Sequence, residues 1–259
     1  MIPWLAPGQP FPPVSAALQS PNGLLAASAE LTAERVLTAY PHGIFPWYSE
    51  EEPVLWWSPD PRMVLFTNEL RVSRSLAKTL RKAASDPLIE LRVDADFDAV
   101  IQACAAPRGD DAGTWITDSI ADAYMELHRR GLAHSFETWV GGRLAGGLYG
   151  VALGRMFYGE SMFSRLADAS KIALAALVRV MQAEGVRVID CQQNTRHLAS
   201  LGAREISRGE FVAHLNASVR AAPIDWARYT DRPLNALLSP EYLVHSCYSS
   251  QLRTDRLID

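Results

Sequence analysis

Three consecutive segments decide the fold of this chain: MFYGES (156–161), DASKIALAALVRVMQAEG (168–185) and VRVIDCQ (186–192). The first and third are short, apolar and rich in aromatic or β-branched residues, which predicts strands. The middle segment is apolar on most faces of a helix, which predicts a buried helix. A strand–helix–strand crossover is right-handed and makes its two strands neighbours or nearly so. We therefore expect Glu160 and Asp190 at the carboxyl ends of adjacent strands.

Upstream of this crossover the hydrophobic period is two. HSFETWV (134–140), a GG turn and LAGGLYGVALG (144–154) predict an antiparallel meander that ends near residue 160. Further upstream we expect a strand at 62–66 and helices at 72–84, 94–106 and 117–131. A meander followed by a crossover resembles the α+β acyltransferase fold of the GNAT type. In that fold two parallel strands splay apart and the acyl donor lies in the gap.

The first 61 residues have a different composition. A short helix is expected at 30–40, with Thr32 as its N-cap. The segment PHGIFPWYSEEEPVLWWSPDPR (41–62) contains five prolines and three tryptophans, and is predicted to be an ordered aromatic loop. We expect a small N-terminal domain (1–61), a GNAT-like catalytic domain (62–241) and a polar C-terminal tail (242–259).

Composition narrows the class of protein. The chain has 259 residues, 48% of them hydrophobic, and a net charge of −4, so no global basic field points to nucleic acid. Its three cysteines are widely spaced and its histidines form no HxxxH pair, so neither a disulfide framework nor a metal site is expected. The N-terminus has no basic signal region, and the longest apolar run (172–178) is too short to span a membrane. We expect a cytoplasmic protein.

The chemistry is expected around Glu160 and Asp190. Gln192 lies two residues beyond Asp190, so both side chains point to the same side of the strand. Ligands of open α/β sheets bind at the carboxyl ends of the strands. The alternative is that each carboxylate caps a helix or pairs with an arginine.

An apolar stripe on the crossover helix gives a second candidate. Leu174, Leu177 and Met181 share one face, and with Met162 they could line a pocket near Glu160, although such stripes are more often core. The segment SRLADASK (164–171) before the helix has no glycine to cradle a pyrophosphate, so we expect an acyl donor other than CoA.

Two further groups suggest nucleic acid. Five basic residues recur at spacings of three and four along the 72–84 helix and could meet a phosphate backbone, or be a solvated face: Arg71, Arg74, Lys78, Arg81 and Lys82. Trp47 and Trp115, with Tyr124, are candidates for stacking on an unpaired base. Trp56 and Trp57 are expected to pack internally.

Several motifs resemble one family. The sequence is similar to the leucyl/phenylalanyl-tRNA–protein transferases of bacteria. The similarity runs in order from about residue 21 to 240 and rests on PNGLLA (21–26), AYPHGIFPWYSEEEPVLWWSPDPR (39–62), GTWIT (113–117), GGLYGVALG (146–154), GESMFSR (159–165), ASK (169–171), IDCQ (189–192) and HLASLGA (197–203). The chain departs from the family at ASAEL (27–31), where a glycine pair and an aspartate are usual.

The resemblance implies an activity and its partners. Such enzymes transfer Leu or Phe, less often Met, from aminoacyl-tRNA to the N-terminal amine of proteins that begin with Arg or Lys, which marks them for degradation. They use no metal and no CoA, and we expect a monomer. The resemblance makes Asp190 and Gln192 catalytic, orienting and deprotonating the amine, while Glu160 binds the donor terminus. In the alternative, Asp190 binds the cationic acceptor and the tRNA ribose carries the proton.

Two other functions are consistent with parts of the sequence. A CoA-dependent N-acyltransferase would share the fold but would need a glycine-containing loop before the 168–185 helix. A non-catalytic tRNA-binding module would not need Asp190 or Gln192.

Overall fold

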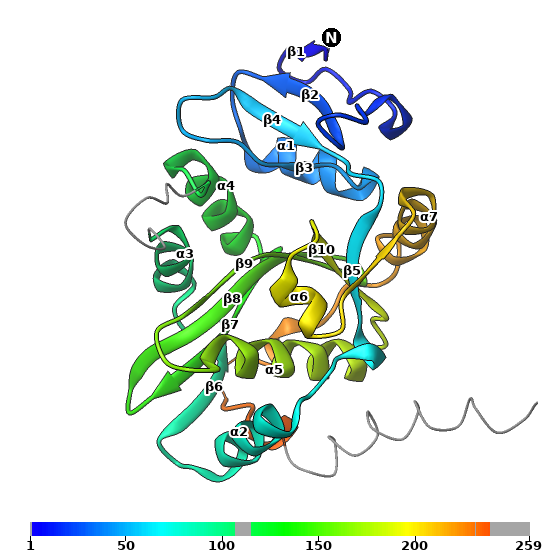
Figure 1. Cartoon of the computed structure of the whole chain (residues 1–259). Helices are drawn as coiled ribbons and strands as arrows, with labels where there is room; N and C mark the ends of the chain where they lie inside the picture. Colours follow the sequence, from blue (N-terminus) through cyan, green and yellow to red (C-terminus); the bar gives the residue numbers. More distant parts are fainter. Residues whose placement is uncertain (1, 107–114, 231, 239–259) are drawn as a thin grey trace, which may run out of the picture.

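A mixed seven-stranded sheet forms the centre of the molecule. The computed structural model describes residues 2–106, 115–230 and 232–238. In spatial order the strands are β11 (Arg204–Ile206), β5 (Arg62–Phe66), β10 (Val188–Gln192), β9 (Met156–Ser164), β8 (Arg143–Leu153), β7 (Ala133–Val140) and β6 (Ile89–Val93). Figure 1 shows the sheet crossing the molecule below a smaller N-terminal layer.

The predicted crossover is confirmed. Helix α5 (Ala169–Ala183) connects β9 to β10, and the two strands pair in parallel through only two registers, Phe157 with Ile189 and Tyr158 with Asp190. Beyond Tyr158, β9 continues to Ser164 paired only with β8. The two parallel strands therefore separate next to Glu160, and the fold is the GNAT-like α+β arrangement expected from the sequence.

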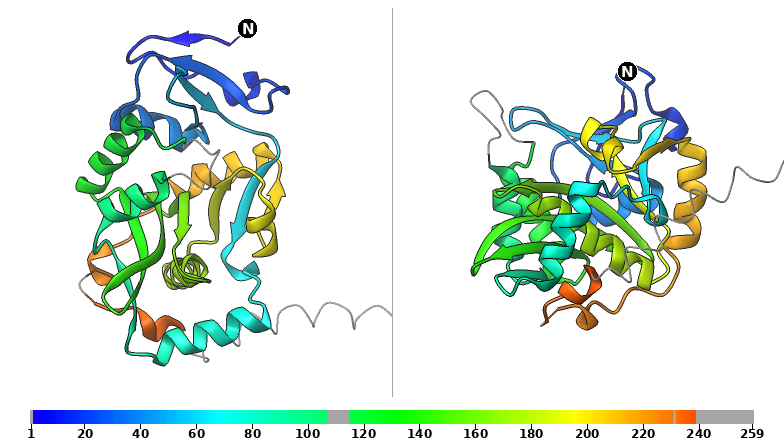
Figure 2. Two further views of the ribbon diagram at one scale, coloured as in Figure 1. Left: turned by 60° about the vertical axis from the view of Figure 1, so that its left-hand side comes forward. Right: turned by 60° about the horizontal axis from the view of Figure 1, so that its bottom comes forward.

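Helices cover both faces of this sheet, as the two views in Figure 2 show. One face is covered by α5 and α2 (Arg74–Ser85), and the other by α3 (Phe97–Ala105) and α4 (Asp118–Arg129). The side chains of Ser73, Asp96 and Thr117 accept from backbone N–H groups in the first turns of α2, α3 and α4, and these caps fix where each helix begins. The shorter helices α6 (Arg196–Ser200) and α7 (Arg208–Ser218) follow β10.

The N-terminal region contains a second sheet of four short strands. Its spatial order is β1 (Trp4–Leu5), β2 (Leu24–Ser28), β4 (Val54–Trp57) and β3 (Phe45–Pro46), and it packs on α1 (Ala33–Ala39). The prediction of an aromatic loop over 41–62 was wrong, because this segment forms the strands β3 and β4. Of its prolines, Pro41 lies in the 3-10 turn Tyr40–His42, Pro46 lies on the edge strand β3, and the other three lie just outside β4 and β5, so none removes a ladder hydrogen bond. Trp56 and Trp57 are buried in β4, as expected.

The boundaries of other elements also differ from those predicted from the sequence. Strand β9 extends three residues beyond the expected end, so Glu160 lies inside it. Helix α3 begins at Phe97, three residues later than expected, with Asp96 as its N-cap. Asp94 has a left-handed backbone, accepts from Ser135 N and contacts His134. Strands β6 and β11 and helix α7 were not predicted, because they are short or weakly amphipathic.

The expected tail, 242–259, lies outside the described residues, and the division of the chain at residue 61 stays a prediction. Within the described part of the chain, no helix is both long and apolar enough to cross a membrane.

Candidate active site

Glu160 occupies a β-bulge. On the paired strand β8, Tyr149 lies opposite Ser161 and Gly150 opposite Gly159, which leaves Glu160 as an extra residue in β9. A bulge bends the strand and re-aims one side chain, and such features are frequent beside active sites. The carboxylate therefore has a direction that regular pleating would not give it.

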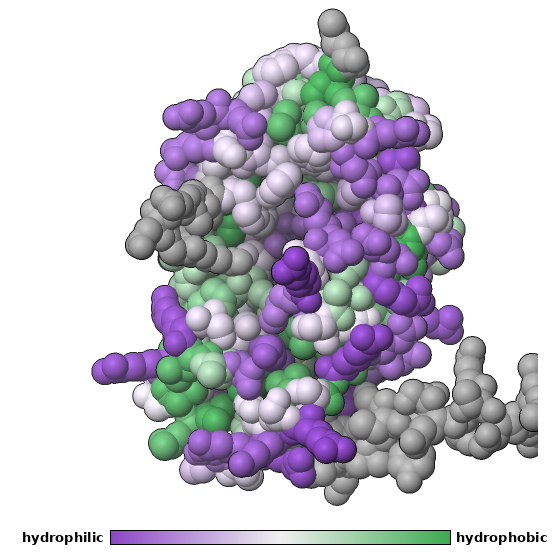
Figure 3. Space-filling model, viewed as in Figure 1, coloured by the Kyte–Doolittle hydropathy of each residue, from purple (hydrophilic) through white to green (hydrophobic). Residues whose placement is uncertain are grey.

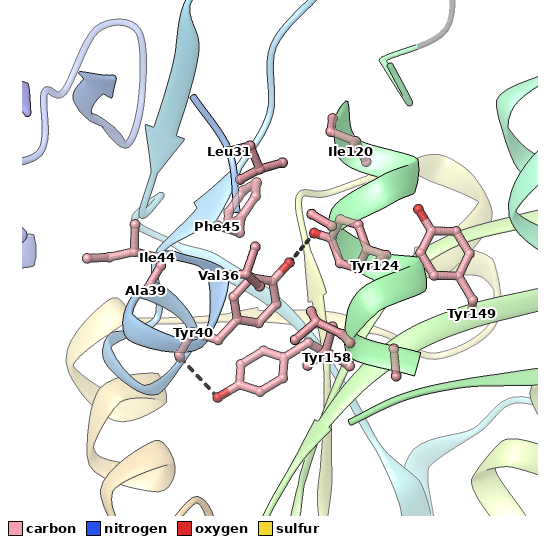
Figure 4. Packing of buried hydrophobic residues seen from close by; sticks show 14 of the residues in the cluster. Leu31, Val36, Ala39, Tyr40, Ile44, Phe45, Ile120, Tyr124, Tyr149 and Tyr158 are labelled. Atoms are coloured by element: carbon pink, nitrogen blue, oxygen red, sulfur yellow. Dashed lines mark hydrogen bonds between the residues drawn. The ribbon is translucent and has the colours of Figure 1, made fainter. Parts of the chain in front are cut away.

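Three neutral donors surround the Glu160 carboxylate. Tyr40 Oη donates to Oε1 at 2.8 Å, Gln192 Nε2 donates to Oε1 at 3.1 Å, and Tyr124 Oη donates to Oε2 at 3.0 Å. The two tyrosine oxygens are themselves 2.5 Å apart, a contact drawn in Figure 4. Tyr40 is fixed in turn by Tyr158, whose hydroxyl donates to the Tyr40 carbonyl.

This environment changes the acidity of the cluster. Burial raises the pKa of Glu160 to about 7, the nearby charge of Asp190 adds to the rise, and the three hydrogen bonds oppose it. Burial and the Glu160 charge also raise the pKa of Tyr40 and of Tyr124 well above the usual value, so both remain protonated donors. Glu160 can therefore take up and release a proton near neutral pH.

Asp190 has the opposite environment. Arg62 Nε and Nη2 donate to its two carboxylate oxygens at 2.8 and 2.6 Å, and the two side chains are only 1% and 0% exposed. The guanidinium also donates to the carbonyl of Gly43 and lies between the rings of Phe45 and Phe211. Asp190 is thus a fully paired internal anion, which was one of the alternatives that the sequence left open.

Gln192 links the two carboxylates. Its backbone N–H donates to Asp190 Oδ1 at 2.9 Å, and its φ of 60° lies in the left-handed region. The pairing of β10 with β5 shifts at this point, so Cys191 is the extra residue of a second bulge. The Gln192 amide then reaches Glu160, as described above.

Two adjoining cavities open at the splayed strands. The larger, of about 900 Å³, is within the size range of small-molecule sites. The smaller, of about 110 Å³, is walled mainly by apolar side chains. Five residues line both and so form their common boundary: Glu160, Ser161, Met162, Cys191 and Leu198. Among the described residues no cluster of three His, Cys, Asp or Glu could hold a metal ion.

The cavities bring together many of the residues expected from sequence. Trp47 and Trp115 line the large cavity, and Trp47 is 40% exposed. Met162, Leu174 and Leu177 line the small one.

Two residues are placed differently from the expectation. Met181 is 0% exposed and packs in the core one turn beyond Leu177, away from both cavities. Tyr124 is fully buried behind Glu160, so it holds that carboxylate and has no free face on which a base could stack. Helical spacing predicts that Met181 shares a face of α5 with Leu174 and Leu177, but it does not predict how far the pocket extends along that face.

The basic side chains form an exposed stripe. Arg71, Arg74, Lys78, Arg81 and Lys82 are all exposed, and α2 lies at the end of the molecule opposite the N-terminal sheet (Figure 1). Figure 3 shows hydrophilic side chains gathered over this end. These five side chains therefore form a positively charged surface at the α2 end of the molecule.

The beginning of α5 carries a carboxylate. Asp168 occupies the N-cap position and pairs with Lys171 at 2.7 Å, while Thr79 of α2 donates to its second oxygen. These hydrogen bonds and the Lys171 charge lower the pKa of Asp168. A negative charge at this helix end would repel a pyrophosphate, in agreement with the absence of a glycine cradle.

Sequence reasoning missed Arg62 and Tyr40 as site residues. Both lie in the motifs that carried the family resemblance, but a single arginine after a proline and a tyrosine at a helix end are common in any protein. Their partners, Asp190 and Glu160, are more than 100 residues away in the sequence. No local pattern could have paired them.

The splayed parallel strands, the adjoining cavities and the carboxylate between them define an acyltransferase. A weak resemblance at the level of the fold alone is found to a GCN5-related N-acetyltransferase from Kribbella flavida, with a TM-score of 0.31 and 12% identity, covering 65% of this chain and 58% of that chain.

Comparison of sequences specifies the class further. The model of the leucyl/phenylalanyl-tRNA protein transferase family matches residues 64–216, and that of its N-terminal domain matches residues 29–60. A leucyl/phenylalanyl-tRNA–protein transferase of Chromobacterium violaceum is 62% identical over 220 residues, 85% of this chain and 93% of the relative. One of Paraburkholderia phymatum is 57% identical over 244 residues, 93% of this chain and 99% of the relative. The chain belongs to the leucyl/phenylalanyl-tRNA–protein transferase family, and it is an aminoacyltransferase.

Proposed function

We propose that this protein transfers Leu or Phe, less often Met, from aminoacyl-tRNA to the N-terminal α-amine of proteins beginning with Arg or Lys, in the cytoplasm, and so marks them for degradation. The observation that carries the proposal is the pair of adjoining cavities. An apolar aminoacyl side chain fits the small cavity, and the terminal nucleoside attached to it fits the large one. Family membership supports the tRNA donor and the protein acceptor.

The donor would be held from two sides. Met162, Leu174 and Leu177 surround the aminoacyl side chain, while Trp47 and Trp115 offer faces for the terminal adenine. Stacking of a base on an aromatic side chain is worth ~1–3 kcal/mol. The ester carbonyl then lies near Glu160 and Gln192, at the boundary of the cavities.

Asp190 acts in this proposal through Gln192. Asp190 belongs to the wall of the small cavity, but its side chain is 0% exposed. Both carboxylate oxygens accept from Arg62 and one also accepts the Gln192 N–H, so Asp190 presents no exposed oxygen to a cationic acceptor or its amine. Asp190 is therefore a positioning residue that holds the left-handed backbone of Gln192. The Gln192 amide orients the reacting groups beside Glu160. Because the donor ester is already activated, positioning of this kind supplies much of the acceleration.

The body of the tRNA would extend from the large cavity toward α2. The five exposed basic side chains, four on that helix and Arg71 just before it, would meet its phosphates. Replacing Arg74 and Lys78 by alanine should weaken tRNA binding and lower the slope of log K against log salt by roughly 1 for each phosphate that is no longer neutralised. Arg220→Ala, an exposed arginine outside the stripe, is the matched control. An unchanged slope in the double variant would remove α2 from the tRNA interface.

The acyl specificity would depend on the small cavity. Leu177→Ala removes side-chain volume from its wall, so the ratio of kcat/KM for Phe-tRNA over Leu-tRNA should rise by about tenfold, the effect expected for small changes in an apolar pocket. Met181→Ala, one turn further along α5 and outside the cavity, should leave that ratio unchanged. Equal effects of the two substitutions would place the aminoacyl side chain elsewhere.

The decisive experiment is transfer of radiolabelled leucine from Leu-tRNA to a peptide with an N-terminal Arg, without CoA and with EDTA. We expect transfer by the wild type and a large loss in Asp190→Ala. Equal transfer by both would remove Asp190 from the site. Absence of transfer by the wild type, with tRNA still bound, would favour a tRNA-binding module instead. The CoA-dependent alternative is disfavoured by Asp168 at the start of α5, and acetyl-CoA should not shift the melting temperature.

A further inference from the structure

Aminolysis of an ester requires a group that takes a proton from the attacking amine. If the proposed function holds, that group must touch the cavity in which donor and acceptor meet. Asp190 belongs to the wall of the small cavity only, its side chain is 0% exposed, and both of its oxygens accept from Arg62. Glu160 lines both cavities, and its three hydrogen bonds leave one of about four carboxylate acceptor positions free.

The hydrogen-bond count around Glu160 shows room for one more proton. Tyr40, Tyr124 and Glu160 make three mutual oxygen–oxygen contacts, of 2.5, 2.8 and 3.0 Å. When Glu160 is ionised, the two hydroxyls supply only two hydrogens for these three contacts. When Glu160 is protonated, three hydrogens close a ring, from Glu160 to Tyr124, from Tyr124 to Tyr40 and from Tyr40 back to Glu160. The cluster therefore accepts a proton without leaving a donor unpaired.

We propose that Glu160 is the general base of aminoacyl transfer, and that the ring formed with Tyr40 and Tyr124 stores the proton between attack and departure of the tRNA. Tyr40 and Tyr124 do not touch the substrates; they are positioning residues for this proton. Tyr40 and Gln192 both donate to Oε1 and only Tyr124 donates to Oε2, so the remaining acceptor position is on Oε2 of a residue that lines both cavities.

The step balances without a co-reactant. The neutral acceptor amine forms an N–C bond to the ester carbonyl carbon, which gives a tetrahedral intermediate with an ammonium nitrogen. The Glu160 carboxylate takes one proton from that nitrogen. The C–O bond to the terminal ribose then breaks, and the proton passes from Glu160 to the departing ribose oxygen. The products are an amide and a free hydroxyl, and Glu160 is again ionised.

Other titratable groups around Glu160 have to be distinguished from it. Tyr40 faces it from the turn after α1, Tyr124 from α4, Tyr149 from β8, and Asp190 with its partner Arg62 from the neighbouring strands. The large cavity also contains Arg165, Cys191 and His197. Burial raises the pKa of the Tyr149 hydroxyl and the Cys191 thiol, and burial lowers the pKa of His197. A carboxyl pKa of about 7 for Glu160 matches the neutral pH at which an α-amine begins to lose its proton.

The test is the pH dependence of single-turnover transfer from Leu-tRNA to an Arg-peptide, for wild type and Glu160→Gln. We expect two ionisations in the wild type, one of Glu160 near 7 and one of the acceptor amine near ~8. Glu160→Gln should lower the maximal rate by about 10²- to 10³-fold, keep only the amine ionisation, and change the KM for Leu-tRNA by a few-fold.

Glutamine resembles the protonated carboxylic acid in shape and can donate to Tyr124, so the variant is expected to fold. Glu137→Gln is the matched control, because Glu137 is also a buried carboxyl with a raised pKa but lies outside both cavities. Its pH profile should equal that of the wild type. Asp190→Asn should be slower yet keep both ionisations.

Three results would overturn the assignment of Glu160. These are a Glu160→Gln enzyme that keeps both ionisations, one that reaches the wild-type maximal rate, and one that loses only affinity for Leu-tRNA. Transfer by the wild type upholds the proposed function even when Glu160 fails this test. A wild type that transfers nothing would overturn both proposals.

Discussion

Strands β9 and β10 each carry one internal carboxylate beside a bulge, and the two carboxylates have opposite environments. Asp190 is neutralised by a bidentate arginine and is fully buried. Glu160 is held by two hydroxyls and an amide, and none of these partners carries a positive charge. A cationic partner stabilises the ionised form and fixes it, whereas neutral donors only offset part of the cost of burial. One carboxylate can therefore serve as a fixed anchor and the other as a group that exchanges protons.

Gln192 shows why the pair works as a unit. Its N–H is held by the fixed carboxylate and its side chain amide contacts the titrating one. An anchor held by a bidentate ion pair keeps the geometry constant while Glu160 changes its charge. The difference between the two environments can be tested by altering each in turn.

The largest effect is expected from removing the charge that fixes Asp190. Arg62→Met leaves a buried carboxylate without its partner, which should lower the free energy of unfolding by about 3–5 kcal/mol and abolish measurable transfer. Chemical denaturation at pH 7.5 and the leucine transfer assay measure the two consequences.

Two variants serve as controls for this prediction. Arg204→Met breaks an exposed pair with Glu69 and should cost at most ~1 kcal/mol. The double variant Arg62→Met/Asp190→Leu removes both buried charges and should recover most of the stability but not the transfer. Recovered transfer in the double variant would contradict a role for Asp190 in holding Gln192.

The second effect concerns stability and pH at Glu160. The pKa is raised in the folded protein, from the ordinary 4.5 to about 7, so the stabilisation by the bound proton is complete below pH 4.5 and is lost as the pH rises through 7. Glu160→Gln removes this loss. The variant should be more stable than the wild type by up to about 3 kcal/mol at pH 8 and gain little at pH 5.

Thermal or denaturant unfolding at the two pH values measures this difference. Glu137→Gln again provides the comparison of stability at the two pH values. Burial also raises the pKa of Glu137, and three hydrogen bonds oppose that rise. A gain in Glu160→Gln that is the same at pH 5 and pH 8 would show that the carboxylate does not titrate near neutrality.

The smallest effect is expected from removing single hydroxyls of the ring. Tyr40→Phe and Tyr124→Phe each delete a donor to the ionised carboxylate, so each should raise the pKa of Glu160 and move the pH–rate profile to higher pH. The hydrogen bond from Tyr40 lowers that pKa more than the one from Tyr124, so Tyr40→Phe should cause the larger shift. The rate at pH 8.5 should fall by less than about tenfold, well below the loss in Glu160→Gln.

Single-turnover profiles of the two variants, run beside the wild type, decide this prediction. Tyr48→Phe removes a partly buried hydroxyl that bonds Ser119 instead, and it should leave the profile in place. Shifts toward lower pH would mean that the closed ring around protonated Glu160 outweighs the two hydrogen bonds to the ionised carboxylate.

The crossover and its neighbours were predictable from sequence because their patterns are local. The period of two over 134–154, the apolar helix over 168–185 and the cap at Thr32 require only residues that are close in the chain. The aromatic segment before Arg62 was misjudged because its strands are two to four residues long and depend on pairing with β2. Such short strands have no pattern of their own.

The sequence by itself determined the family, the α+β crossover and the presence of Glu160, Asp190 and Gln192 on two neighbouring strands. Only the tertiary structure decided what each carboxylate does. Arg62 and Tyr40 come from segments more than 100 residues away, and the bulges depend on the register between strands. Charge and burial act through space, so the partner that fixes one carboxylate and the hydroxyls that let the other titrate are set by the fold as a whole.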